Sequence, residues 1–373
     1  MVEFAWPPGP GGQSVLSWGI RILCPDNERS TEMLALKERK DTFEIGESPS
    51  SPRLVFRGFR GEEDYPAMSA IIEGSKEADG VEWTQSVEDV ARTYRHLVNC
   101  DADRDLLFAE VRGEVVGYGR VWWQQEAEGT RLYQHFVHLL PQWRDTGIRR
   151  AMLQQNERRL RQIAAGHPDD GPRLLQCWAS DTEDHWRNLL EREGYSPVRY
   201  GFSMVRPDLE EIPDLPLPEG LEVRPVPAER VQSVWRAARE AFRDHWGYSE
   251  DEWSCEHWKE WQESPTYSPA LWQVAWAGDE VAGMVLNFIN EEENGEYGRL
   301  RGYTETICVR RPWRRQGVAK SLIARSLQVL KGQGMTEAAL GVDADNPNGA
   351  LQLYKGMGFR VVKEFTTYRK PMP

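Results

Sequence analysis

The stretch that decides the fold runs from Ile307 to Ser321 and reads ICVRRPWRRQGVAKS. It opens with three apolar residues, Ile307 to Val309, which predict the end of a buried strand. Cations and Pro312 follow, and apolar residues then recur at helical spacing, which predicts a helix over Gln316–Gly332. The sequence therefore predicts a strand, a basic turn and a helix N-terminus in direct succession.

The turn between this strand and this helix has the features of an anion-binding site. The first N–H groups of a helix lack intrahelical partners, and the helix dipole adds partial positive charge there. Gly317 and Ala319 are small, so a phosphate can reach the backbone without meeting a side chain. Arg314, Arg315 and Lys320 add positive charge around the same turn. We therefore expect the turn to bind a phosphorylated ligand.

Two stretches of the chain carry a family resemblance. Arg314-x-x-Gly317-x-Ala319 resembles the Arg/Gln-x-x-Gly-x-Gly/Ala signature of the GNAT superfamily of acyl-CoA-dependent N-acetyltransferases. Downstream, residues 346–354 (NPNGALQLY) and the pair Gly358-Phe359 resemble the second signature of that superfamily, a short helix that ends in Gly-Phe. The resemblance covers about residues 53–373. It implies an α/β fold, a mixed and mostly antiparallel sheet flanked by helices, with acetyl-CoA as the acyl donor.

The chain also repeats itself once. The matched pairs are EVVG at 114–117 and EVAG at 280–283, WRDTG at 143–147 and WRRQG at 313–317, and LLEREGY at 189–195 and LYKGMGF at 353–359. Three matches in one order at nearly constant spacing imply the duplication of a whole domain. We predict a poorly structured N-terminal extension (1–52), a degenerate GNAT domain (53–206), a proline-rich linker (207–218) and a catalytic GNAT domain (219–373).

Each copy is predicted to have the same order of elements. In the second copy these are a strand at Leu221–Val226, helices at Glu229–His245 and Glu250–Glu263, strands at Leu271–Trp276, Glu280–Ile289 and Tyr303–Val309, a helix at Gln316–Gly332, a strand at Ala338–Val342, a helix at Asn346–Met357 and two short strands within Arg360–Tyr368.

Length and composition favour a two-domain protein of the soluble globular class. The chain has 373 residues, 40% hydrophobic and 28% charged. Its net charge of -13 disfavours nucleic acid and anionic membranes as partners. Five scattered cysteines without a CxxC pair, and an N-terminus without a signal-peptide pattern, predict a cytoplasmic protein that lacks a metal site. The sequence leaves open whether the protein is a monomer or a homodimer, and whether Met1 or Met33 is its start.

The resemblance implies roles for residues of the second copy. The residues that it assigns to donor binding are Ile307, Cys308, Val309, Arg314, Arg315, Gln316, Gly317, Val318, Ala319, Lys320 and Asn346. Backbone groups of the strand would hold the thioester and the pantetheine arm, and one N–H would stabilise the oxyanion. Tyr354 falls where the family has the acid that protonates the departing thiolate; its alternative role is packing on the sheet. Asn346 either contacts pantetheine or caps the helix before Pro347.

The acceptor amine must lose a proton, so a base is expected. Glu305 is the first candidate, because alternation along a strand places it on the same face as Ile307 and Val309. A solvated strand end or an ion pair with an arginine is the alternative explanation. Asp343 is the second candidate. Cys308, of opposite parity, is interpreted as a small buried residue, since direct transfer needs no nucleophile.

The predicted substrate-side helices of the second copy are rich in tryptophan and acidic residues. The residues concerned are Trp235, Trp246, Trp253, Trp258, Trp261, Trp272, Glu250, Asp251, Glu252 and Glu256. In the family these helices shape the acceptor pocket, and such a surround suits a cationic or sugar-like small-molecule amine. Packing in the core is the alternative explanation for the tryptophans.

The first copy lacks the residues to which chemistry is assigned. The replacements are Arg149 for Ala319, Leu190 for Tyr354 and Thr182 for Asn346. We therefore expect it to keep the fold and supply an interface without catalysing. An intact C-terminal copy behind a degenerate one resembles the arrangement of the mycothiol synthases, which acetylate the cysteinyl amine of a pseudodisaccharide. Two alternatives remain: a non-catalytic acyl-CoA-binding sensor or scaffold, and a protein or peptide amine acetyltransferase with an open groove.

Overall fold

The computed structural model describes residues 53–372 with the exception of residue 83, and the predicted N-terminal extension (1–52) lies outside the described residues. We call residues 53–206 the first repeat and residues 219–373 the second repeat. The helices and strands of the first repeat are β1 Leu54–Arg57, α1 Tyr65–Glu73, α2 Lys76–Asp79, α3 Val87–Arg95, α4 Ala102–Asp105, β2 Leu106–Val111, β3 Glu114–Gln125, β4 Arg131–Leu139, α5 Ile148–Ala164, β5 Arg173–Ser180, α6 Asp184–Arg192 and β6 Ser196–Arg206.

The second repeat has the same order of strands, but among the described residues it has two helices instead of four between its first two strands, and it adds α9. Its elements are β7 Glu222–Val223, α7 Val231–Phe242, α8 Cys255–Glu263, β8 Gln273–Ala277, β9 Glu280–Ile289, α9 Glu291–Tyr297, β10 Arg301–Val309, α10 Val318–Gly332, β11 Glu337–Asp343, α11 Ala350–Gly356 and β12 Arg360–Pro371. The predicted hairpin that turns near Gly278 is confirmed. The predicted strand at 221–226 shortens to two residues, and α9 was not predicted.

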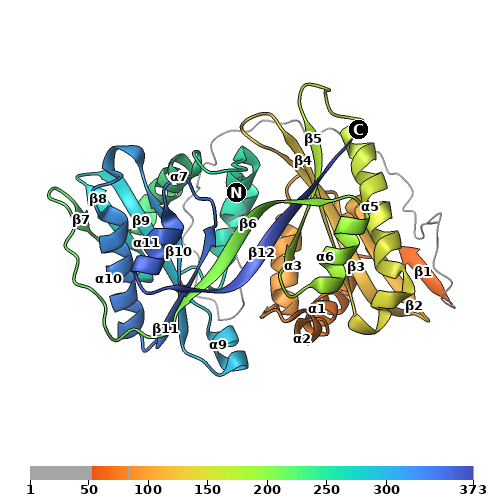
Figure 1. The fold of residues 1–373 in the computed structure, drawn as a ribbon, viewed down its shortest axis with the longest axis horizontal. Coiled ribbons are helices and arrows are strands. Elements are labelled where there is room, and N and C mark those ends of the chain that lie inside the picture. The colour runs from red at the N-terminus through yellow and green to blue at the C-terminus, as the bar shows by residue number, and fades with distance from the viewer. Residues whose placement is uncertain (1–52, 83, 373) are drawn as a thin grey trace.

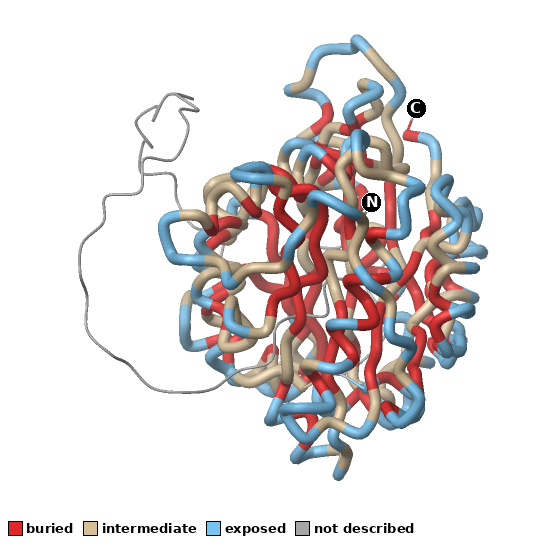
Figure 2. Tube along the Cα trace, turned by 90° about the vertical axis from the view of Figure 1, so that its left-hand side faces the viewer, coloured by how far each residue is buried: buried red, intermediate tan, exposed pale blue. Residues whose placement is uncertain are grey.

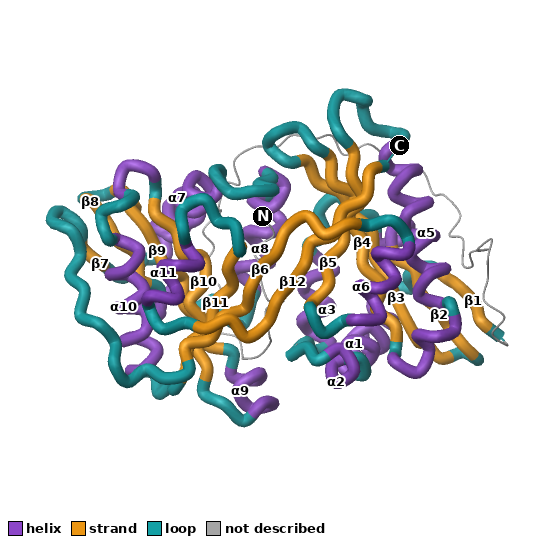
Figure 3. Tube along the Cα trace, in the orientation of Figure 1, coloured by secondary structure: helices purple, strands orange, loops and turns teal. Residues whose placement is uncertain are grey.

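All described strands form one continuous sheet, in the order β1-β2-β3-β4-β5-β12-β6-β11-β10-β9-β8-β7. The last strand of each repeat therefore lies against the other repeat: β12 pairs with β5, and β6 pairs with β11. These two strands cross the middle of the molecule together (Figure 3). The prediction of two short strands in 360–368 was wrong. One twelve-residue strand replaces them, because it runs on to complete the sheet of the first repeat.

Helices cover both faces of each half of the sheet (Figure 1). In the first repeat, α5 and α6 bury one apolar core and α1 and α3 bury another on the opposite face. In the second repeat, α10 and α11 cover one face and α7 and α8 the other. Figure 2 shows the strands buried at the centre and exposed residues concentrated in the outer loops. We name the two faces of the second repeat the α10 face and the α7 face.

The segment predicted as a linker packs on the second repeat. Leu209 is buried in the core beneath α10, and the Ser321 hydroxyl at the start of that helix donates to the Pro216 carbonyl at 2.7 Å. Arg206 donates to the Met357 carbonyl at 2.6 Å. These contacts hold the connection against the helix that follows the basic turn.

Candidate active site

The two central strands of the second repeat separate partway along their length. β10 and β11 run parallel and pair only from Arg301↔Glu337 to Tyr303↔Ala339, although both strands continue. Beyond that point, the carboxylate of Glu305 accepts a hydrogen bond from the backbone N–H of Gly341 at 2.9 Å. Backbone groups of a parted pair of strands need other partners, so this gap is suited to a ligand with hydrogen-bonding groups.

A β-bulge lies in β10 at the start of the gap. The pairing with β9 shifts by one residue between Glu305 and Cys308. Thr306 has a φ of 48°, in the left-handed region that β-branched residues rarely adopt. In the first repeat, β4 pairs with β3 in unbroken register. The bulge therefore distinguishes the two repeats.

The bulge overturns the predicted orientation of Glu305. Glu305 lies opposite Leu286 on the α7 face, whereas Ile307 and Val309 pack against the core of the α10 face. Cys308 is buried on the α7 face, so it shares the side of Glu305 instead of opposing it. The rule that side chains alternate between the two faces of a strand gave the wrong face for Glu305. One inserted residue in the bulge switches the face of every side chain that precedes it in the strand.

The turn after β10 has the predicted geometry. Gly317 has a φ of 89° and caps α10, which begins at Val318 two residues later than predicted. A Cβ on Gly317 would meet nothing within 4 Å, so the backbone conformation and not crowding calls for glycine. The N–H groups of the first helical turn, from Val318 to Lys320, have no intrahelical acceptors. They line the cavity described below.

Arg314, one of the three cations expected around the turn, is held by hydrogen bonds to the protein itself. Its Nε donates to the Val309 carbonyl at 2.8 Å, and its other nitrogens donate to Asp244 at 2.6 Å and to the Ala241 carbonyl at 3.1 Å. Hydrogen bonds from Arg311 and Arg314 hold the pKa of Asp244 well below its usual range. The guanidinium thus ties the end of β10 to the end of α7.

The same tie occurs in the first repeat. The Arg144 guanidinium donates to the Leu139 carbonyl at 3.4 Å and to Asp79 at 2.7 Å, and Gly147 has a φ of 84°. In both repeats the signature arginine therefore stabilises the turn through hydrogen bonds to the preceding strand and to an aspartate. Arg315 and Lys320, both exposed, are left as the cations that can approach a phosphate in the second repeat.

A cavity of about 630 Å³ opens from the gap and the turn. Of the residues predicted to form the site, it is lined by Glu305, Ile307, Cys308, Val309, Arg314, Arg315, Gly317, Val318, Ala319, Lys320, Asn346 and Tyr354. The predicted donor-binding residue Gln316 does not line it. Its side chain is exposed and donates to the Pro312 carbonyl at 3.0 Å.

Tyr354 lies on α11 at the edge of the cavity. Its side chain is buried, with 5% of the residue exposed, and its ring packs edge-on against Phe359 at 6.3 Å. Asn346 also lines the cavity, and of the two roles left open for it the structure contradicts the helix cap. The helix begins at Ala350 with Gly349 as its N-cap, and the Asn346 side chain accepts from the N–H of Asn348 at 2.9 Å.

Asp343, the second candidate for the base, is committed to an ion pair. Its two oxygens accept from the Nε and Nη2 of Arg199 at 2.8 and 2.7 Å. Arg199 lies on β6, which belongs to the first repeat in sequence and to the second in space. Such a bidentate pair fixes the carboxylate as part of the cavity wall.

Most of the tryptophans form core. The side chains of five of them pack against one another in the core of the α7 face, and one pair, Trp261 and Trp272, is stacked. The five are Trp235, Trp253, Trp258, Trp261 and Trp272. Trp246 differs, because it lines the cavity under the guanidinium groups of Arg369 and Arg199, at 4.3 and 5.3 Å. Packing, not substrate binding, explains the other five.

The acidic residues near α8 do not surround the cavity as expected. Their partners are Arg239 and Arg243 for Glu250, the Gln125 N–H for Asp251, the Gln124 amide for Glu252, and His96 and Lys259 for Glu256. Three of these four acids contact the first repeat. They hold the repeats together instead of attracting a cationic acceptor.

The other wall of the cavity comes from residues that sequence reasoning missed. Gln124, Gln176 and Trp178 of the first repeat and Thr367 and Arg369 of β12 line it. No motif marks them, and the exchange of strands that brings them to the site is not visible in the sequence. His245, at the end of α7, also lines the cavity. Burial lowers its pKa to about 4, so its imidazole is neutral at neutral pH.

In both repeats the fourth strand is followed by a left-handed glycine and a helix N-terminus, and comparison with known proteins agrees with this arrangement. The model of the Acetyltransferase (GNAT) family matches residues 68–167 and 233–359. The chain belongs to the GNAT family. The chain is an N-acetyltransferase with two tandem GNAT domains, whose exact boundaries remain the prediction given above.

Several relatives cover most of this GNAT chain. The mycothiol acetyltransferase of Geodermatophilus obscurus is 26% identical over 297 residues, which cover 79% of this chain and 90% of the relative. That of Thermobispora bispora is 25% identical over 303 residues, covering 79% and 92%. A GCN5-related N-acetyltransferase from Sphaerobacter thermophilus has a TM-score of 0.66 at 25% identity, covering 86% of this chain and 97% of that one. A tandem GNAT protein from the clavulanic acid pathway has a TM-score of 0.61 at 14% identity, covering 86% and 99%, and shows the shared fold.

Proposed function

We propose that the second repeat transfers the acetyl group of acetyl-CoA directly to a small amine, in the cavity between the repeats. The observation that carries the proposal is that one cavity joins the parted strands, the N-terminus of α10 and Tyr354. Acetyl-CoA needs all three: hydrogen bonds along its arm, amides at its pyrophosphate and a proton for its thiolate. The catalytic assignment to 219–373 rests on this arrangement.

Donor binding is proposed for the turn and for the open edge of β10. Backbone N–H groups of Val318 to Lys320 and the side chains of Arg315 and Lys320 would face the pyrophosphate. Backbone groups of Ile307 to Val309 would hydrogen-bond the pantetheine arm and polarise the thioester carbonyl. The side chains of Ile307 and Val309 serve the core, so backbone alone is assigned to the ligand there.

The chemical step is a nucleophilic attack by a neutral amine. Its nitrogen bonds to the thioester carbon, the C–S bond breaks, and the amine gives up one proton while the thiolate takes one. Glu305 is assigned as the base, directly or through one water, since its carboxylate is held at the gap by the Gly341 N–H. Tyr354 is assigned as the acid, since a phenol can protonate a thiolate without being ionised at neutral pH.

The acceptor is proposed to lie between the repeats. Tryptophans fill the space beneath α7 and α8, so room for an amine remains on the side of Gln124, Gln176 and Trp178. The wall there is polar and its arginines are paired with carboxylates. This enclosure favours a small molecule over a protein substrate. The named relatives make a mycothiol-type amine the first acceptor to test.

The test is a thiol-release assay with acetyl-CoA, a panel of small amines and a lysine-containing peptide. Release that depends on a small amine, with the acetylated product identified by mass spectrometry, is the expected result. Binding of acetyl-CoA without release for any acceptor would instead favour the alternative of a non-catalytic acyl-CoA sensor. A preference for the peptide would favour a protein acetyltransferase.

A further inference from the structure

The first repeat also contains a parted pair of strands. β4 and β5 run parallel and pair from Arg131↔Arg173 to Gln134↔Gln176, and they then stop pairing although both continue. The turn that follows β4 has the left-handed glycine and the arginine brace of the second repeat. The framework of a donor cleft is therefore present twice.

In the first repeat, two side chains bridge this gap. The Nε of Arg149 donates to the Val137 carbonyl on β4 at 3.1 Å, and the Nε1 of Trp186 donates to the Trp178 carbonyl on β5 at 2.9 Å. The guanidinium lies over the Trp186 ring at 4.5 Å. Both side chains are buried, at 2% exposed each. A stacked pair thus satisfies one carbonyl on each of the strands that part.

The second repeat has alanine at both of these positions. Ala319 follows Gly317 as Arg149 follows Gly147, and Ala350 precedes Gly358 by the same interval that separates Trp186 from Gly194. Both alanines line the large cavity. Two large side chains in place of two small ones account for a filled gap in one repeat and an open gap in the other.

Arg149 keeps its positive charge inside the gap, and the histidines beside it are neutral. Burial lowers the pKa of Arg149 to about 10, which still leaves it protonated at neutral pH. Burial, together with Arg149 itself, lowers the pKa of His138 to about 3 and also lowers that of His185. The histidines stay neutral, so the guanidinium carries the positive charge in this gap, where Glu183 and Asp79 are the acids that act on it.

We infer that the first repeat retains a closed acyl-CoA cleft, in which Arg149 and Trp186 occupy the place of the pantetheine arm. This inference rests on the donor site proposed for the second repeat. The ligand class is a coenzyme A thioester or coenzyme A itself. Removal of the stacked pair should reopen the cleft without any change to the turn.

The experiment measures coenzyme A binding by calorimetry in variants whose second-repeat donor site is blocked by Ala319→Arg. Ala319→Arg alone should bind none. Ala319→Arg with Arg149→Ala and Trp186→Ala should regain one equivalent per chain. Ala319→Arg with Arg150→Ala is the matched control, because Arg150 is the exposed neighbour that donates to Glu193, and it should bind none.

Absence of binding by the triple variant, with a folded circular dichroism spectrum, would overturn the inference. If loss of Trp186 prevents folding, the Ala319→Arg/Arg149→Ala variant is tested in its place. Coenzyme A should then raise the Tm of this variant but not that of the Arg150 control. No such rise would also overturn it. One equivalent bound by Ala319→Arg alone would instead contradict the donor site proposed for the second repeat, which keeps the two failures distinct.

Discussion

Turns 144–149 and 314–319 share a left-handed glycine before a helix, but they differ in what fills the space beside them. Each holds a glycine with φ between 84° and 89°, and each is braced by an arginine bound to an aspartate and to the preceding strand. One turn opens on a cavity and the other is filled by Arg149. The signature arginine and glycine therefore shape the turn, whereas the residue two positions after the glycine decides whether a ligand fits.

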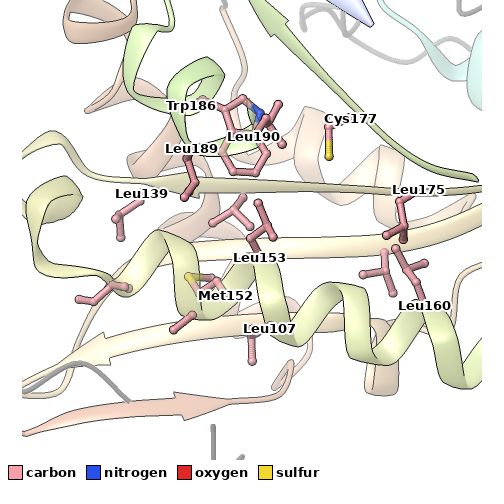
Figure 4. Close-up of a cluster of buried hydrophobic side chains, with 14 of the residues drawn as sticks. Leu107, Leu139, Met152, Leu153, Leu160, Leu175, Cys177, Trp186, Leu189 and Leu190 are labelled. Carbon is pink, nitrogen blue, oxygen red and sulfur yellow. The ribbon is translucent and has the colours of Figure 1, made fainter. Parts of the chain in front are cut away.

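The helix after the fifth strand of each repeat shows the same division. α11 places Tyr354 at the cavity, whereas α6 places Leu190 in an apolar core. In Figure 4, Leu190 and Trp186 of α6 lie in the cluster that includes Leu153 of α5. The first repeat has core packing where the second has the proposed ligand site, and its residues supply a wall of the cavity. Single substitutions test this difference between the repeats.

The largest effect is expected for Ala319→Arg. This substitution gives the turn of the second repeat the arginine that fills the turn of the first repeat, Arg149. The first repeat shows that an arginine folds at this position, so acetyl-CoA binding should vanish while Tm changes little. Calorimetry and thermal unfolding measure the two quantities. Ala319→Gly is the control and should bind normally, since glycine leaves the turn open. One retained equivalent in the arginine variant would mean that the position does not face the donor.

Tyr354→Phe is expected to lower kcat by ~10²–10⁴-fold, the usual contribution of a general acid. The acetyl-CoA Kd should not change, because the hydroxyl is needed only as the thiolate leaves. Stopped-flow thiol release and calorimetry test the two statements. Tyr200→Phe, at another tyrosine that lines the cavity, is the control and should keep its rate. An unchanged kcat for Tyr354→Phe would assign the phenol to packing.

Glu305→Gln should lower kcat by roughly 10²-fold while acetyl-CoA still binds. The amide keeps the size of the carboxylate and can still accept from the Gly341 N–H, but it cannot take a proton. Asp343→Asn should behave differently: it breaks the pair with Arg199, so Tm should fall more than kcat. An unchanged kcat in the Glu305→Gln variant would show that a chain of water molecules, and not Glu305, accepts the proton of the amine.

A smaller effect, and a contrast between the repeats, is expected for the two aspartates that hold the signature arginines. Asp244→Asn removes a charge-assisted hydrogen bond worth ~1.5–3 kcal/mol, and loosening the turn should raise the acetyl-CoA Kd about tenfold. Asp79→Asn should lower Tm to a similar extent and leave the Kd unchanged. Equal effects of both variants on the Kd would contradict a single donor site.

The smallest effect concerns pH and the contact between the repeats. Burial raises the pKa of Glu252, which accepts from Gln124, to about 7. The folded protein therefore holds this proton more tightly than the unfolded chain, so its contribution to stability falls as pH rises from the usual carboxyl range to about 7. Glu252→Gln should flatten the Tm profile between pH 5 and 8. An unaltered profile would show that this carboxyl does not titrate there.

Several features followed from the sequence alone. Strand, glycine turn and helix over 307–332 were predictable, because apolar spacing and the conformational freedom of Gly317 act locally. The duplication was predictable because both copies kept their turn motifs. Arg149, at the position of Ala319, identified the turn that is filled by a side chain, since a long side chain there has to occupy the space it enters.

Other features were decided by tertiary structure. The bulge at Thr306 places Glu305 on the α7 face instead of the α10 face. No local sequence pattern predicts one extra residue in a strand. The exchange of β6 and β12 brought Gln124 and Gln176 of the first repeat to the site on the second repeat, because strands pair through backbone groups that every sequence shares. Sequence specified the turns and the periodicities, whereas long-range pairing selected which distant side chains face the cavity.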